Sequence, residues 1–121
     1  MKKIKVKIIG KQVEADLLNP DVAEQFDKEY AACIAKIRGA VNESTGVKGL
    51  RVQCTAIVDF IENIFGAGSA KEVFGEEVDL LTCLDALEEM TDLYEKQVNP
   101  HIEKATAVIN EKLEPLLTKA E

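Results

Sequence analysis

The chain has 121 residues, of which 46% are apolar, and this composition fits one globular domain and excludes a wholly disordered chain. The net charge is −7, although Lys2, Lys3, Lys5, Lys7 and Lys11 place five positive charges in the first eleven residues. The rest is acidic enough to disfavour nucleic acid as a partner. The sequence contains no apolar run of the ~20 residues that cross a membrane. It also lacks a secretory signal, and its three scattered cysteines suit reduced thiols in a cytoplasm.

The first segment alternates between apolar and charged residues with the period of a half-buried strand. Ile4, Val6 and Ile8 share one face, and lysines occupy the other, as on the solvent side of an edge strand. A second alternating run ends at Leu17. The pattern predicts a β-hairpin over residues 3–17, with a tight turn at Gly10-Lys11.

Two long helices are predicted next. Asn19-Pro20 has the form of a helix start, because asparagine caps free amides and proline fits the first helical position. The first apolar stripe follows at helical spacing: Val22, Phe26, Tyr30, Cys33, Ile34, Ile37 and Val41. Residues 42–49 are predicted to form a loop. A second stripe, ended by Gly66, contains Leu50, Cys54, Ile57, Val58, Ile61, Ile64 and Phe65.

Shorter helices are predicted beyond Gly66. Ser69 and Glu72 have the spacing of a capping box, which predicts a short helix that ends at Gly75. Asp79 is predicted to cap a longer helix with the stripe Leu80, Leu84, Leu87, Thr91, Tyr94 and Val98. Asn99-Pro100 is expected to break or kink that helix. The apolar series then resumes as Ile102, Ala105, Ile109, Leu113 and Leu116, with fraying from Pro115 on.

These elements predict a mainly α fold, a bundle of three to four helices preceded by an N-terminal β-hairpin. We expect a single domain over residues 1–121, with the hairpin at 3–17, a helical core at 20–98 and a C-terminal helix at 99–121.

The sequence contains no clear pattern of catalytic, metal-binding or phosphate-binding residues. The one histidine, His101, cannot complete a zinc site or a di-metal site. Cys33, Cys54 and Cys83 lie on or beside apolar stripes, where cysteine behaves as a small core residue. The loop at 66–69 lacks the preceding strand and the Lys-Ser/Thr pair of a phosphate-binding loop. We therefore expect no catalytic residue, no cofactor, no metal and no enzymatic activity; a Cys–His pair involving His101 is the remaining enzymatic alternative.

Two groups of residues are candidates for partner binding. Phe65 and Phe74 flank a glycine turn, where phenylalanine either plugs the core or anchors a partner, and the core plug is the favoured interpretation. Acidic residues gather opposite the Leu80–Tyr94 stripe and form either a solvated face or a landing patch for a basic partner. They are Asp85, Glu88, Glu89, Asp92 and Glu95.

One pattern resembles a known group of proteins. Residues 59–75 read D-F-x-x-x-x-F-G-x-G-x-A-x-x-x-F-G, and an L-x-x-C-L-x-A helix starts at Leu80. This arrangement, together with the hairpin and the Asp21-Val22-Ala23-Glu24 helix start, resembles tail-assembly-chaperone-like proteins of phages and prophages of Gram-positive bacteria. The resemblance covers the chain to about residue 98 and is weaker beyond it.

The resemblance implies a function. Such chaperones bind the long, helical tape-measure protein and keep it soluble until the tail tube forms around it. They are mostly helical and tend to self-associate. On this basis we expect a protein partner, the tape-measure protein, in the bacterial host cytoplasm, with neither nucleic acid nor membrane as a partner. The apolar stripes permit a homo-oligomer. The alternatives are a structural tail component of the virion and a general helical adaptor between proteins.

Overall fold

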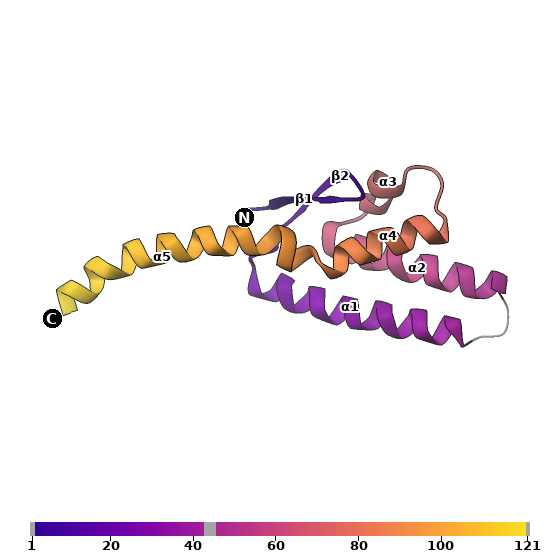
Figure 1. Cartoon of the computed structure of the whole chain (residues 1–121), viewed down its shortest axis with the longest axis horizontal. Coiled ribbons are helices and arrows are strands. Elements are labelled where there is room, and N and C mark those ends of the chain that lie inside the picture. Colours follow the sequence, from indigo (N-terminus) through magenta and orange to yellow (C-terminus); the bar gives the residue numbers. More distant parts are fainter. Residues whose placement is uncertain (1, 43–45, 121) are drawn as a thin grey trace.

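A β-hairpin opens the chain and helices make up the rest (Figure 1). The computed structural model describes residues 2–42 and 46–120. Strands β1 (Ile4–Ile8) and β2 (Lys11–Ala15) pair antiparallel. The helices are α1 (Pro20–Val41), α2 (Gly46–Phe65), α3 (Ser69–Phe74), α4 (Leu80–Thr91), a π-helical turn η1 (Tyr94–Val98) and α5 (Asn99–Ala120). The mainly α class with an N-terminal hairpin is confirmed.

The hairpin turn lies one residue earlier than predicted. Ile8 pairs with Lys11, so Ile9 and Gly10 are the central residues, not Gly10 and Lys11. Both have positive φ, 43° and 80°, as this tight turn requires. An isoleucine rarely adopts that conformation. The turn is tied to α4, because the Ile9 N–H donates to both carboxylate oxygens of Glu89 at 3.1 Å.

Helices α1 and α2 pack side by side. The Asn19 side chain accepts from the Asp21 N–H at 2.9 Å, which confirms the predicted cap of α1. A Cβ at Gly49 would lie 3.3 Å from the Ala40 carbonyl oxygen, so glycine permits the close approach of the two helices. The predicted loop at 42–49 is wrong from residue 46 on, where α2 begins, and residues 43–45 lie outside the described residues.

The core lies between the apolar face of the hairpin and the inner faces of α1, α2 and α4. An aromatic cluster joins three helical elements. Phe26 of α1 lies 5.2 Å from Phe60 of α2 and 5.0 Å from Tyr94 of η1, measured between ring centroids. Tyr30 completes it, 6.0 Å from Phe60. The Tyr94 hydroxyl donates to the Leu17 carbonyl at 2.9 Å, so the cluster also fixes the chain that leaves the hairpin.

Some predicted stripes are rotated relative to the real core. Val41, Leu50, Leu84 and Thr91 were placed on apolar faces but are exposed. Small or neglected residues take the buried positions: Ala40, Ala56, Phe60, Ala86, Met90 and Leu93. Alanine at positions 40, 56 and 86 fits where helices pack closely, whereas Phe60, Met90 and Leu93 are among the largest fully buried side chains.

The α3 start also differs from the prediction. Gly68, with φ of 88°, occupies the cap position without a side-chain bond, and Ser69 is the first helical residue. The buried Ser69 hydroxyl donates to the Gly66 carbonyl at 2.7 Å instead. Ser69 thus closes the turn between α2 and α3 and caps no helix. The predicted end of α3 at Gly75 is confirmed.

Asn99-Pro100 was expected to break or kink the helix, and the helix is irregular there: the π-helical turn η1 stands directly before Asn99. The Asn99 N–H donates to the Tyr94 carbonyl five residues earlier, and α5 continues from there. A proline clashes with the carbonyl four residues before it, and the wider turn before Pro100 accommodates this. The Gln97 amide fixes η1 to β1, because it accepts from the Lys7 N–H and donates to the Lys7 carbonyl, both at 2.7 Å.

Helix α5 projects from the body and forms one end of the molecule (Figure 1). Of its side chains up to residue 118, all are exposed except the half-buried Ala105. Pro115 lies inside the helix. The predicted fraying of the last residues stays a prediction.

Candidate functional site

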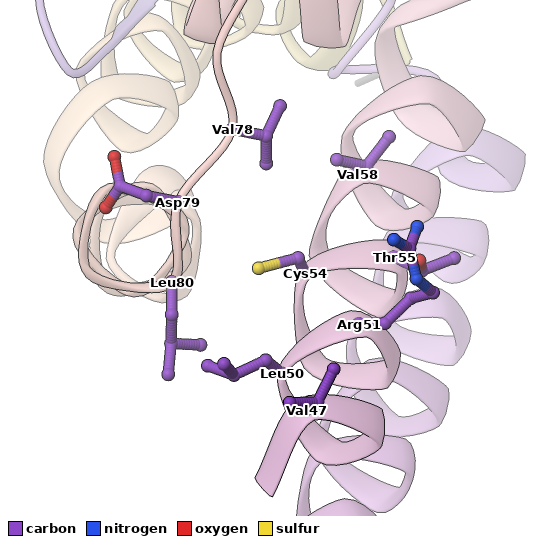
Figure 2. A pocket seen from close by; sticks show the side chains of 9 residues that line it. All are labelled: Val47, Leu50, Arg51, Cys54, Thr55, Val58, Val78, Asp79 and Leu80. Atoms are coloured by element: carbon purple, nitrogen blue, oxygen red, sulfur yellow. The ribbon is translucent and has the colours of Figure 1, made fainter.

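An open apolar groove lies between the first half of α2 and the segment that enters α4. Its volume is about 560 Å³. Figure 2 shows Val58 and Val78 at one end, Leu50, Val47 and Leu80 at the other, and the Cys54 sulfur between the two helices. The lining is therefore aliphatic on both walls, with a thiol on its floor.

The groove exists because α2 extends beyond its cover. Helix α2 packs against α1, α4, α3 and β2, while its first residues extend beyond the start of α4 (Figure 1). Val47 is 82% exposed, Leu50 45% and Val78 47%. Three aliphatic side chains that face one another across a gap and remain this exposed form a surface that is stabilised when a partner covers it.

The α4 wall is held in place by its cap. The Asp79 carboxylate accepts from the Thr82 N–H at 2.9 Å and from the Thr82 hydroxyl at 2.8 Å, which confirms the predicted cap. These hydrogen bonds to Thr82 hold the pKa of Asp79 below its usual value. Asp79 is therefore ionised at neutral pH and fixes the direction in which Leu80 enters the groove.

The two rims carry opposite charge. Arg51 lies on the outer side of α2 in Figure 2, and Lys48, three residues earlier, shares that side of the helix. On the other rim, Glu77 and Asp79 flank Val78 and are exposed. A helix lying in the groove would thus meet positive charge on one side and negative charge on the other.

A second uncovered apolar surface lies on α5. Ile109 is 52% exposed and Leu117 is 66% exposed. They belong to a set of large aliphatic residues on this helix that are at least partly exposed: Ile102, Val108, Ile109, Leu113, Leu116 and Leu117. At 100° per residue, all of these except Val108 fall within ~100° of the helix surface, and we call those five residues the α5 stripe.

The partner-binding residues expected from sequence lie elsewhere. Phe65 and Phe74 are half-buried and pack against the core, which favours the core-plug interpretation. Among the acidic residues, Glu89 binds the Ile9 N–H and Asp92 pairs with Lys96 at 3.3 Å, whereas Asp85, Glu88 and Glu95 are exposed. None of the seven lines the groove. Their role in partner binding stays a prediction.

Sequence reasoning missed the groove for an identifiable reason. Leu50 and Leu80 are the first members of their stripes and were assigned to the core with the others, while Val47 and Val78 fell in predicted loops. The sequence did contain a signal. Valine and leucine stand on both sides of two predicted helix starts, so each apolar stripe is longer than one packed helix can cover.

The three cysteines differ in environment. Cys33 and Cys83 are buried, as expected, whereas Cys54 is half-buried on the groove floor. Burial raises the pKa of the Cys33 thiol to about 11. Burial, and then the neighbouring Cys54 thiol, raises the pKa of Cys83 to about 12.

We expect iodoacetamide at pH 8 to alkylate Cys54 first. The thiolate is the nucleophile, and a thiol with a pKa of about 12 is ionised in roughly one molecule in ten thousand at that pH. Mass spectrometry of peptides from the native protein should show Cys54 modified at least tenfold faster than Cys33 and Cys83. Equal rates in the native protein would contradict this environment, and equal rates in denaturant provide the control.

The described residues carry neither a metal cluster nor a membrane-spanning helix. Within residues 2–42 and 46–120, histidine, cysteine, aspartate and glutamate form no group of three or more that could hold a metal ion. Across the same residues, none of the helices is long and apolar enough to cross a membrane.

Comparison with known proteins gives a family. Neither the curated proteins nor the solved structures yield a match to this chain. A family model does match, over residues 9–115, from the hairpin turn to the last turns of α5. It therefore includes both groove walls and most of the α5 stripe. With nearly the whole length matched, the chain belongs to DUF6673, a family of unknown function.

Proposed function

We propose that this protein binds an apolar helix of another protein in the α2–α4 groove and performs no catalysis. We further propose that the partner is a tape-measure protein and that the chain is a tail assembly chaperone of a phage or prophage, acting in the bacterial cytoplasm. The observation that carries the proposal is the uncovered aliphatic lining of the groove.

The groove has the dimensions of a helix-binding site. From Val47 to Val58 it follows eleven residue steps of α2, or ~16 Å at 1.5 Å per residue, about three turns of a helix. A helix-in-groove contact uses anchors at positions i, i+3, i+4 and i+7, which three turns can supply. Aliphatic walls suit leucine, isoleucine or valine anchors, and Arg51, Thr55 and Asp79 are the polar residues of the lining.

The charge distribution suits a chaperone role. A tape-measure protein contains long helices with apolar stripes, and these aggregate when uncovered. Each bound copy would cover about three turns of such a stripe and present its acidic outer surface to water. Like charges on neighbouring copies then keep the complex dispersed.

Co-expression with the candidate partner tests the proposal. The long helical protein encoded by the neighbouring reading frame should be soluble when this chain is co-expressed and insoluble when produced alone, and the two should co-purify. A neighbourhood of metabolic genes, or a tape-measure protein that stays insoluble with this chain present, would contradict the chaperone function. Detection of the chain in purified virions by mass spectrometry would favour a structural tail component.

A further inference from the structure

The two uncovered apolar surfaces lie at opposite ends of the molecule. The groove is formed by the starts of α2 and α4 at one end, and the α5 stripe projects at the other (Figure 1). Because α4, η1 and α5 follow one another along the long axis, α5 cannot fold back into the groove of its own chain without breaking η1. The contacts of Gln97 and Tyr94 with the hairpin hold η1 in place. Any pairing of the two surfaces must therefore join two copies.

We propose that the α5 stripe of one copy lies in the α2–α4 groove of a second copy. The occupant of the groove in the free protein is thus this chain itself, in a head-to-tail contact. Such a contact is heterologous, so it leaves one groove and one α5 free in every dimer and extends to a ring or an open chain.

The lengths of the two surfaces agree. The most exposed part of the stripe runs from Ile109 to Leu117, eight residue steps or ~12 Å. The groove extends ~16 Å along α2 from Val47 to Val58. This part of the stripe therefore fits within the length of the groove.

The charges also agree. Viewed down α5 at 100° per residue, His101 and Lys112 lie on one side of the stripe, and Glu103 and Glu114 lie on the other. The groove has a basic rim at Lys48 and Arg51 and an acidic rim at Glu77 and Asp79. One placement sets Glu114 against the basic rim and Lys112 against the acidic rim. The reversed placement sets like charges together, so charge selects the direction of the helix.

Helix α5 also requires support that its own chain does not give. An isolated helix of about 20 residues is marginal in water. This one contains Pro115 and the β-branched residues Ile102, Thr106, Val108 and Ile109, all of which lower helix propensity. Contact along the stripe would stabilise the helix and cover its apolar side chains in one step.

Paired substitutions distinguish this contact from every other pairing. Leu50→Asp places a carboxylate in the groove, and Ile109→Asp places one in the stripe. Both positions are exposed, so neither substitution disturbs the core. Leu18→Asp, at a leucine of 43% exposure outside both surfaces, is the matched control. Circular dichroism establishes that each variant is folded, and sedimentation velocity over a hundredfold concentration range gives the mass.

The wild-type protein and Leu18→Asp should grow in mass with concentration, while Leu50→Asp and Ile109→Asp should each stay at the 13.3 kDa of one chain. An equimolar mixture of the last two should give a complex of twice that mass and no larger. It joins the intact α5 of one variant to the intact groove of the other, and both remaining surfaces are disabled.

Three results would overturn the proposal. A wild-type protein that stays monomeric at all concentrations shows that the groove does not take α5. Self-association of Leu50→Asp at wild-type strength shows that the copies meet through a surface other than the groove. A mixture that stays monomeric shows that the two surfaces do not meet. The proposed function is tested separately. If the wild type is monomeric but Leu50→Asp abolishes its binding to the tape-measure protein, the head-to-tail contact is disproved and the proposed function stands.

Discussion

Replacing Phe60 with alanine is expected to lower the free energy of unfolding by about 3–5 kcal/mol, the usual cost of truncating a buried phenylalanine. Phe60 is 1% exposed and lies within 6.0 Å of two other rings, Phe26 and Tyr30. Its removal leaves a cavity where α1 and α2 meet. Chemical denaturation followed by circular dichroism measures the change.

The matched control is Phe65→Ala. Phe65 lies five residues later on the same helix but is only half-buried, so its truncation removes less contact. We expect its cost to be less than half that of Phe60→Ala. If Phe65→Ala were the more destabilising of the two, the centre of the core would lie near the glycine turn and not at the aromatic cluster.

Leu50→Asp is expected to weaken binding of the tape-measure protein at least ~100-fold, equivalent to roughly 3 kcal/mol. A carboxylate on the groove wall would be covered by an apolar helix without a partner of opposite charge, and the loss of its hydration opposes binding. The melting temperature should change by no more than a few degrees, because Leu50 is 45% exposed in the free protein. Titration of purified partner followed by calorimetry gives the affinity.

Two controls make the binding result specific. Leu18→Asp introduces the same charge at a similarly exposed leucine and should bind with wild-type affinity. Glu88→Lys reverses a charge on the acidic face of α4, which does not line the groove. If Glu88→Lys abolished binding and Leu50→Asp did not, the acidic face would be the partner surface instead.

The sequence predicted the elements of this fold because their signals are local. Period-two alternation marked the hairpin, and Asn19 and Asp79 marked two helix starts through side-chain bonds that need only adjacent residues. Gly66 and Gly75 marked helix ends through their positive φ angles of 104° and 74°. Such features depend on a few neighbouring residues, and pattern reasoning therefore located them.

What failed depends on packing between distant elements. Ile9 adopts a positive φ angle in a turn whose N–H is held by Glu89, eighty residues away. The π-helical turn before Pro100 is fixed by Gln97 against Lys7 of the hairpin. A single stripe gives no information about either contact, so the turn position was predicted incorrectly and the π-helical turn was not foreseen.

The groove could not be predicted for a related reason. Periodicity identifies Leu50 and Leu80 as apolar-face residues, but it does not tell whether another element covers that face. Leu50 remains 45% exposed although Leu80 of α4 lines the same groove, and only the assembled fold shows this. At the uncovered end of an apolar stripe, the sequence therefore does not distinguish exposed binding residues from buried core residues.

If a partner helix occupies the α2–α4 groove, it covers Cys54 on the groove floor, so the accessibility of this thiol measures occupancy directly. The rate of Cys54 alkylation is measured with and without the tape-measure protein, in the Ile109→Asp variant, whose α5 cannot fill the groove of another copy. Bound partner should slow the modification of Cys54 at least tenfold. An unchanged Cys54 rate in a stable complex would show that the partner binds elsewhere and would contradict the account.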